Sequence, residues 1–263
     1  MGGPYDAAMT YIDVNGHQTW LTVSGSHEQT VLLLHGGLSE SDAMLDTVGG
    51  PLGAHYRVAA FDRRGHGRTA DTAEPFRYDA MADETVAVLE HLGGRAHVVG
   101  YSDGGITGLL VALSRPDLVD RLVTIGANFH HEGLRELNPP EGDDDPAFAR
   151  IAQTYAERSP DGADHFEEFT AKTFAMFQSE PTLTVADLAR IEVPTLVLVG
   201  DDDLVELAHT VELYESIPEA QLAVVPAASH LLPIEQPDET ARIILRYLAT
   251  PLPPKTMLPS RRA

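Results

Sequence analysis

Residues 96–113, AHVVGYSDGGITGLLVAL, combine a strand pattern, a sharp turn and a helical pattern. The mainly apolar start is typical of a strand buried on both faces, and the apolar spacing after the turn is typical of a helix. Gly100 and Gly104 flank Ser102 in a Gly-x-Ser-x-Gly string. The string alone is common by chance, but the strand–turn–helix context favours a strained turn. We expect this turn to present the hydroxyl of Ser102 as a nucleophile at the end of a sheet.

The same strand pattern recurs on both sides of this stretch. The further short apolar runs are residues 31–34, 58–61, 122–125, 195–199 and 222–225. Because they do not alternate with polar residues, these runs favour strands buried on both faces. Helical patterns between the strands are at residues 80–92, after Ser102, and at residues 211–217 and 239–248. This alternation predicts an α/β fold with a mostly parallel sheet covered by helices on both faces.

Three segments depart from this alternation. Residues 9–24 surround Asn15-Gly16, a pair that favours the tight turn of a β-hairpin. Residues 129–190 contain six of the eight phenylalanines and favour helices, whereas the end of the chain is rich in proline. We therefore predict a core of residues 1–128 and 191–250, a small helical cap of residues 129–190 and a C-terminal extension of residues 251–263.

A serine hydroxyl needs a general base at neutral pH, and the base needs a carboxylate that fixes its tautomer. Among the 12 histidines, His230 follows the last strand pattern and precedes the last helix, so we assign it as the base. Asp201, Asp202 and Asp203 follow the penultimate strand pattern. One of these aspartates is predicted to be the acid, which gives the chain order serine, aspartate, histidine.

Acyl transfer also requires hydrogen-bond donors for a developing oxyanion. His35-Gly36-Gly37 follows a buried strand pattern, so the backbone N–H groups of Gly37 and Asp103 are the expected pair, with Leu38 as a second choice for the first donor. A carboxylate that faced the reacting centre would oppose the negative charge. We therefore expect the side chain of Asp103 to point away from it.

These motifs together resemble the α/β-hydrolase superfamily over roughly residues 10–250. They are Leu34-His35-Gly36-Gly37, FDRRGHGRT at residues 61–69, Gly100-Tyr101-Ser102-Asp103-Gly104-Gly105, Gly200-Asp201-Asp202-Asp203 and Ser229-His230. The resemblance implies that the acid is the last residue of a Gly-x-x-Asp turn, Asp203, with Asp201 and Asp202 less favoured. It also implies a structural role for residues 62–69. Haloalkane dehalogenases and epoxide hydrolases carry an aspartate where this chain has Ser102, which argues against both.

Composition restricts the partners of the chain. Its formal net charge is -22, from 40 acidic and 18 basic residues, which disfavours nucleic acids and anionic lipid surfaces. The absence of cysteine excludes disulfides and thiolate chemistry. Neither a signal peptide nor a membrane segment is visible, so we expect a cytoplasmic protein. We expect no metal and no cofactor, a small-molecule substrate, and no nucleic-acid or membrane partner. The oligomeric state is left open.

The expected function is hydrolysis of carboxylic ester or lactone bonds through an acyl-enzyme. Phenylalanines of the cap offer apolar surface, and Phe129, Phe166 and Phe169 are the predicted substrate-binding residues. Small, neutral and largely apolar substrates are therefore expected.

Other readings stay open. The chain could bind a ligand with little turnover, or it could act as an acyltransferase, a perhydrolase or a carbon–carbon bond hydrolase with the same three residues. A metal-dependent hydrolase using His130-His131-Glu132 and the aspartates at 201–203 is disfavoured, because the spacing fits no familiar metal site.

Overall fold

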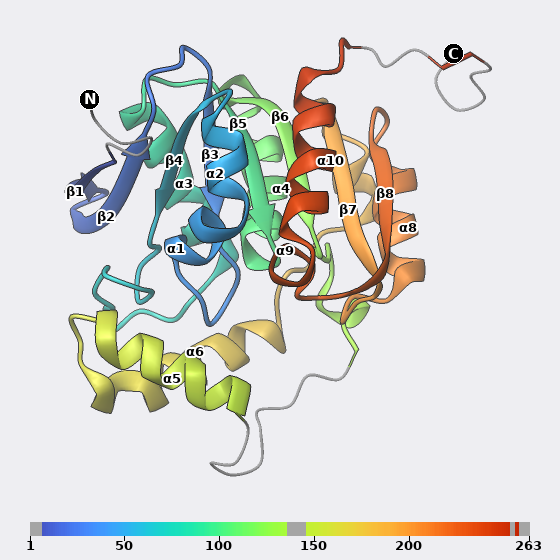
Figure 1. Cartoon of the computed structure of the whole chain (residues 1–263). Helices are drawn as coiled ribbons and strands as arrows, with labels where there is room; N and C mark the ends of the chain where they lie inside the picture. The colour runs from blue at the N-terminus through green and yellow to red at the C-terminus, as the bar shows by residue number, and fades with distance from the viewer. Residues whose placement is uncertain (1–6, 136–145, 253–255, 258–263) are drawn as a thin grey trace.

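The computed structural model describes residues 7–135, 146–252 and 256–257, and its centre is a sheet of eight strands (Figure 1). Their order is β1-β2-β4-β3-β5-β6-β7-β8, and the strands from β3 to β8 are parallel. The strands are β1 (Ala8–Val14), β2 (His17–Ser24), β3 (Thr30–Leu34), β4 (Arg57–Phe61), β5 (Ala96–Tyr101), β6 (Val119–Ile125), β7 (Thr195–Asp202) and β8 (Gln221–Ser229). The predicted α/β architecture is confirmed.

The hairpin predicted around Asn15-Gly16 is β1 and β2, which pair antiparallel from Ala8↔Val23 to Val14↔His17. Asn15 and Gly16 have φ angles of 55° and 85°, the left-handed conformation that this tight turn requires. Strand β2 also pairs antiparallel with β4. The hairpin therefore extends the parallel part of the sheet on the side of β4.

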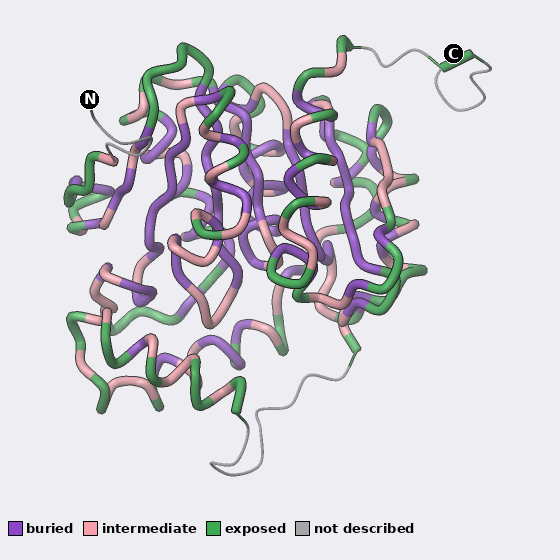
Figure 2. The backbone as a smooth tube through the Cα atoms, viewed as in Figure 1, coloured by how far each residue is buried: buried purple, intermediate pink, exposed green. Residues whose placement is uncertain are grey.

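Helices cover both faces of the sheet, because successive residues of its buried strands point to opposite sides. On one face, α3 (Tyr78–His91), α4 (Asp103–Ser114) and α8 (Leu207–Ser216) pack against a cluster that contains Leu32 and Val98. On the other face, α1 (Ser41–Met44), the π-helical turn Leu45–Gly49, α2 (Gly50–Gly53) and α10 (Pro237–Ala249) pack around Val31 and Val99. The tube in Figure 2 is accordingly buried along the central strands.

Strand β8 differs from the sequence expectation. We predicted that residues 222–225 are buried on both faces, but only Val225 of these four is buried and Val224 is 40% exposed. The reason is topological, since β8 is the last strand of the sheet and pairs with β7 alone among the strands that the structure describes. An apolar run alone does not distinguish a central strand from an edge strand.

Helices α5 (Pro146–Arg158) and α6 (Phe166–Phe177) lie beyond the carboxyl ends of the parallel strands (Figure 1). Both helices lie within the segment predicted as a cap, residues 129–190. Residues 136–145 of that segment lie outside the described residues. Helix α7 (Val185–Leu188), at the end of that segment, instead contributes Leu188 to the core cluster under α8. Short elements complete the chain: α9 (Leu232–Glu235) and the 3-10 turns Pro116–Leu118, His131–Gly133 and Ala163–His165.

Charged side chains attach α5 and α6 to the core. Arg158 of α5 pairs with Asp42 of α1, and Lys172 of α6 pairs with Asp71 at 2.7 Å. Asp161, between the two helices, accepts the backbone N–H of Asp71 at 2.8 Å. Burial would raise the pKa of Asp71, but hydrogen bonds from Lys172, the Thr72 N–H and His165 outweigh it and lower that pKa. The Asp71 carboxylate is therefore ionised where it holds the cap.

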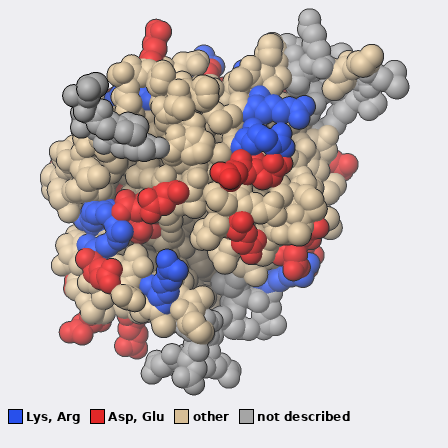
Figure 3. Space-filling view, in the orientation of Figure 1, with Lys and Arg blue, Asp and Glu red and all other residues tan. Residues whose placement is uncertain are grey.

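The outer surface carries both signs of charge. On the face shown in Figure 3, basic side chains lie beside acidic ones and form no extended patch of their own. Within the described part of the chain, no helix is both long and apolar enough to cross a membrane.

Candidate active site

The turn between β5 and α4 holds Ser102 in a strained conformation, with φ 51° and ψ -116°. The N–H of Ser102 donates to the carbonyl of Ile125 on β6 at 2.8 Å, which anchors the turn to the sheet. A Cβ atom at Gly100 would collide with the backbone of Gly104, and one at Gly104 would collide with the backbone of Leu34. The two glycines of the motif are therefore required for close packing of strand and helix.

Three predicted residues come together at the carboxyl ends of β5, β7 and β8. The Nε2 atom of His230 lies 3.0 Å from the Oγ atom of Ser102, and its Nδ1 atom lies 2.7 Å from Oδ1 of Asp203. The side chain of Asp203 is 2% exposed and that of His230 is 15% exposed. A carboxylate oxygen is a hydrogen-bond acceptor, so Nδ1–H donates to Asp203, and Nε2 carries no proton and faces the hydroxyl. This is the geometry of a serine activated by a general base.

Burial distinguishes Asp203 from the two aspartates before it. Asp201 and Asp202 are exposed at the end of β7, whereas Asp203 accepts the N–H of Val205 at 3.0 Å as well as the histidine. Gly126 follows β6 with φ 58°, and a Cβ atom there would lie 3.1 Å from both Asp203 Oδ2 and His230 Nδ1. The glycine therefore lets the loop after β6 approach this pair.

The loop after β3 brings Gly36 and Gly37 against the serine turn. A Cβ atom at Gly36 would lie 2.9 Å from the ring of Tyr101 and 3.4 Å from Cβ of Ser102. A Cβ atom at Gly37 would lie 2.5 Å from Oδ2 of Asp103 and 2.6 Å from the ring of Phe177. The two predicted oxyanion donors, Gly37 and Asp103, thus belong to segments in direct contact.

The side chain of Asp103 is buried at the start of α4 and accepts the hydroxyl of Tyr78 at 2.8 Å. Its second oxygen, Oδ2, has no hydrogen-bond partner among the described residues and packs against Gly37. The carboxyl group of Asp103 therefore packs against Gly37, one of the proposed donors, whereas we expected this side chain to point away. Burial raises the pKa of Asp103, although the positive charge of Arg63 and the bond from Tyr78 oppose this rise.

A model of the alpha/beta hydrolase family matches residues 31–243. The chain belongs to this family. Among curated relatives, a protein of Agrobacterium fabrum named as a carbamate hydrolase (RutD) is 30% identical over 244 residues, which are 84% of this chain and 94% of that protein. A protein of Metapseudomonas resinovorans named 2-hydroxy-6-oxo-6-(2'-aminophenyl)hexa-2,4-dienoic acid hydrolase is 27% identical and covers 91% of this chain and 90% of its own.

Solved structures agree with this assignment. A serine hydrolase involved in carbazole degradation (CarC enzyme) superposes with a TM-score of 0.76 and 25% identity, over 92% of this chain and 99% of that one. An enol-lactonase from Burkholderia xenovorans has the same fold, with a TM-score of 0.70 and 19% identity, over 90% of this chain and 99% of that one. The protein is therefore a hydrolase of the α/β-hydrolase fold.

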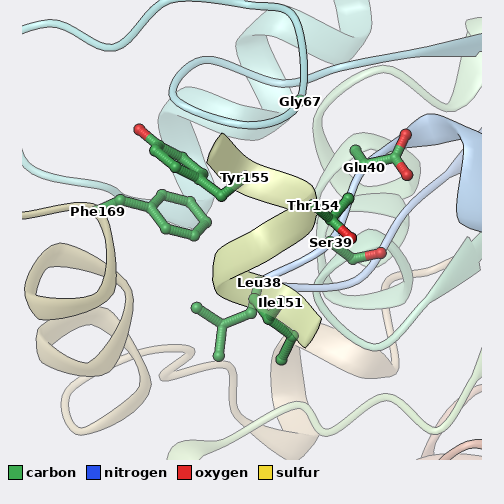
Figure 4. Close-up of a pocket in the computed structure, with 8 residues that line it drawn as sticks. All are labelled: Leu38, Ser39, Glu40, Gly67, Ile151, Thr154, Tyr155 and Phe169. Atoms are coloured by element: carbon green, nitrogen blue, oxygen red, sulfur yellow. The ribbon is translucent and has the colours of Figure 1, made fainter. Parts of the chain in front are cut away.

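The predicted substrate-binding phenylalanines of this α/β-hydrolase separate into two places. Phe129 follows β6, packs in the core cluster under α8 and stacks on His209 with ring centroids 4.0 Å apart. Phe166 and Phe169, both on α6, belong to a separate cluster between the cap and the core. Only Phe169 of the three lines the small cavity shown in Figure 4.

That cavity, of about 20 Å³, lies where α5 and α6 meet the loop after β3 (Figure 4). It is lined by Leu38, Ser39, Glu40, Gly67, Ile151, Thr154, Tyr155 and Phe169. Leu38 directly follows Gly37, so the cavity begins next to the proposed oxyanion loop. Its volume suits about one water molecule, and a substrate would have to separate the cap from the core to use it.

Three further side chains at this site were not predicted from the sequence. Tyr78 binds Asp103, Phe177 packs on Gly37, and Tyr155 stacks on Phe169 with ring centroids 4.7 Å apart. Phe177 was recognisable only as one of several cap phenylalanines. Tyr78 carried no local signal, because its partner lies 25 residues further along the chain.

The side chains of the hydrolase that could bind a metal ion pair with other side chains of the protein. Among the described residues, the ligand atoms of Asp71, His165 and Glu168 lie within 4.8 Å of one another. However, Lys172 lies 2.7 Å from Asp71 and 3.1 Å from Glu168, so a protein cation already occupies this position. His130 and Glu132 lie 3.6 Å apart near the surface and form no such group with the aspartates at 201–203.

Proposed function

We propose that the protein is a serine hydrolase that cleaves carboxylic ester or lactone bonds through an acyl-enzyme on Ser102. The observation that carries this proposal is the continuous hydrogen-bonded series from Ser102 Oγ through His230 to Asp203, with distances of 3.0 and 2.7 Å. A buried carboxylate at Nδ1 fixes the tautomer in which Nε2 is the acceptor, so the histidine can take the serine proton. The proposal refines the family assignment to a bond type and a nucleophile.

In the first half-reaction, Ser102 Oγ bonds to the substrate carbonyl carbon while its proton passes to Nε2 of His230. The carbonyl electron pair moves onto oxygen, and the N–H groups of Gly37 and Asp103 stabilise the resulting negative charge. Collapse breaks the bond to the leaving alcohol, whose oxygen takes the proton from His230. Water then repeats the sequence on the acyl-enzyme and releases the acid.

The apolar side chains near Ser102 and the charge of the protein favour small, neutral and largely apolar substrates. The cluster above the site contains Phe166, Phe169 and Phe177 from α6, which offer apolar contacts. The net charge of -22 disfavours polyanionic substrates. The relatives named for carbamate hydrolysis and for cleavage of a dienoic acid define the two most informative competitors in a substrate panel.

The test combines labelling with a substrate panel. A fluorophosphonate probe should label the wild type and not Ser102→Ala, and kcat should fall by about 10⁶ in that variant. The panel contains p-nitrophenyl esters of increasing chain length, lactones, carbamate esters and vinylogous 1,5-diketones. A highest kcat/KM for short neutral esters or lactones supports the proposal. Preference for carbamates or diketones, near-stoichiometric turnover, or persistent labelling of Ser102→Ala would overturn it.

A further inference from the structure

Arg63 is a buried cation directly beneath the proposed oxyanion loop. It stands in Asp62-Arg63-Arg64-Gly65, at the position that the motif Asp-x-Arg-Gly leaves free, and it is only 1% exposed. A fully buried arginine is rare unless it performs a specific interaction, because its desolvation is costly. Its Nε and Nη1 atoms have no hydrogen-bond partner among the described residues. The polar contacts of the guanidinium are therefore made by its third nitrogen, Nη2.

The Nη2 atom of Arg63 donates to the carbonyl oxygen of Gly36 at 3.0 Å and also lies 3.1 Å from Nδ1 of His35. The same oxygen lies 2.7 Å from Nδ1 of His35. The backbone N–H of Arg63 donates to the other ring nitrogen, Nε2, at 3.2 Å, which makes Nε2 the acceptor. The ring proton is then on Nδ1, so His35 also donates to Gly36. Two donors therefore hold this one carbonyl.

The held carbonyl belongs to the peptide that carries the N–H of Gly37. This peptide is trans, and in a trans peptide the C=O and N–H bonds point in opposite directions. Fixing the Gly36 oxygen on the side of Arg63 therefore directs the Gly37 N–H to the opposite side. A peptide between two glycines has little intrinsic conformational preference, so its orientation depends on such external contacts.

We propose that Arg63 is a positioning residue that orients the Gly36–Gly37 peptide, so that the Gly37 N–H faces the oxyanion of the tetrahedral intermediate. The inference rests on the proposed serine-hydrolase function. The guanidinium charge acts in the same direction, because the positive group lies behind the peptide whose N–H stabilises negative charge. Burial lowers the pKa of Arg63, and the negative charge of Asp103, whose carboxyl group packs against Gly37, opposes this lowering most.

The test uses Arg63→Met, which keeps an unbranched stem and removes the guanidinium donors, and Arg63→Lys, which can retain one donor. We expect kcat for a p-nitrophenyl ester to fall about 10- to 100-fold in Arg63→Met with little change in KM, since losing one oxyanion donor outright costs 10²–10³. Arg63→Lys should lose less. Arg64→Met is the matched control, because Arg64 bonds instead to Thr72, Glu74 and Pro75.

A second readout measures the oxyanion directly. A ¹³C-labelled trifluoromethyl ketone forms a hemiketal with the serine, and the pKa of this hemiketal reports how well the donors stabilise its oxyanion. We expect that pKa to rise by about one to two units in Arg63→Met, matching the loss in kcat at tenfold per unit. Circular dichroism and urea unfolding verify that each variant is folded. If Arg63→Met does not fold, the smaller loss expected of Arg63→Lys is measured with the same two readouts.

The outcomes separate the two proposals. If the folded Arg63 variants keep the kcat and hemiketal pKa of the wild type, or change KM alone, the positioning role is refuted while the serine mechanism stands. If Ser102→Ala retains activity, the proposed function itself fails. A loss in kcat with a raised hemiketal pKa, alongside an unaffected Arg64→Met, establishes the positioning role.

Discussion

Asp203 and His230 lie 2.7 Å apart, Oδ1 to Nδ1, with the aspartate side chain 2% exposed. The neighbouring Asp201 makes a different bond, since its Oδ1 accepts the N–H of Ala228 at 3.3 Å. Of these three consecutive aspartates, Asp203 is the one within hydrogen-bond distance of His230, so we expect it to fix the tautomer of the histidine.

We predict that Asp203→Asn lowers kcat by about 10³–10⁴, because an amide favours the wrong histidine tautomer. Asp201→Asn and Asp202→Asn should change kcat less than tenfold. Steady-state kinetics on the three variants measures this, with thermal unfolding as the folding control. A larger loss in either exposed variant, with folding intact, would place the acid elsewhere.

Gly37→Ala should lower kcat by about 10²-fold. The new methyl group would lie 2.5 Å from Asp103 Oδ2 and 2.6 Å from the Phe177 ring, so the loop must shift and the N–H of residue 37 must move with it. Gly53→Ala is the control, because its methyl group would meet nothing closer than 3.9 Å. Equal activity of both variants would show that the position of this loop does not matter for turnover.

Phe169→Ala should reduce the free energy of unfolding by about 3–5 kcal/mol, because the ring is 2% exposed and packs on Tyr155, His66 and Phe76. The enlarged space beside Leu38 should also move the optimum of an ester series to longer acyl chains. Urea unfolding and the chain-length series test these two effects. An unchanged optimum in a variant with lost stability would mean that Phe169 serves the cap core alone.

Glu40 makes stability depend on pH. Burial raises the pKa of this buried carboxyl to about 7, against an ordinary value of 4.5, even though the N–H of Asp42 and Arg158 act to lower it. The folded state therefore favours the protonated acid. Its contribution is complete below pH 4.5 and is lost as the pH rises through 7.

We predict that Glu40→Gln, which retains an acceptor for the Asp42 N–H, is more stable than the wild type by about 1–3 kcal/mol at pH 8. At pH 4.5 and below, the two should unfold at the same urea concentration. The exposed Glu28→Gln serves as the control at both pH values. A wild type that is more stable than Glu40→Gln at pH 8 would show that the ionised carboxylate is stabilised by Arg68 and Arg158.

Local patterns were sufficient for most of the fold and for part of the site. Short apolar runs located the strands, and the positions of Ser102, Asp203 and His230 after three of them brought these residues to one edge of the sheet. Local patterns were not sufficient where packing depends on partners distant in sequence. Lys172 and Asp71 lie 101 residues apart, and Arg63 contacts Gly36 across 27 residues.

The segment from Ser41 to Gly53 shows another limit. It forms α1, a π-helical turn and α2, although Gly49, Gly50 and Pro51 interrupt any helical signal in the sequence. Tertiary packing of Met44, Val48 and Leu52 against the sheet overrides this weak propensity.

The division into core, cap and extension, and the roles of the site residues, stay predictions.

Strand β8 leads into His230 at the margin of the sheet, where β7 is its one neighbouring strand among the described residues. Ser102, in contrast, is fixed between interior strands. The two partners of one proton transfer are therefore anchored with unequal firmness. Margins of sheets open at lower free energy than their centres, so mild denaturant should silence the enzyme while most of its backbone amides are still protected from solvent exchange. Activity would then be lost when the edge strand opens locally, at a lower denaturant concentration than the unfolding seen by circular dichroism.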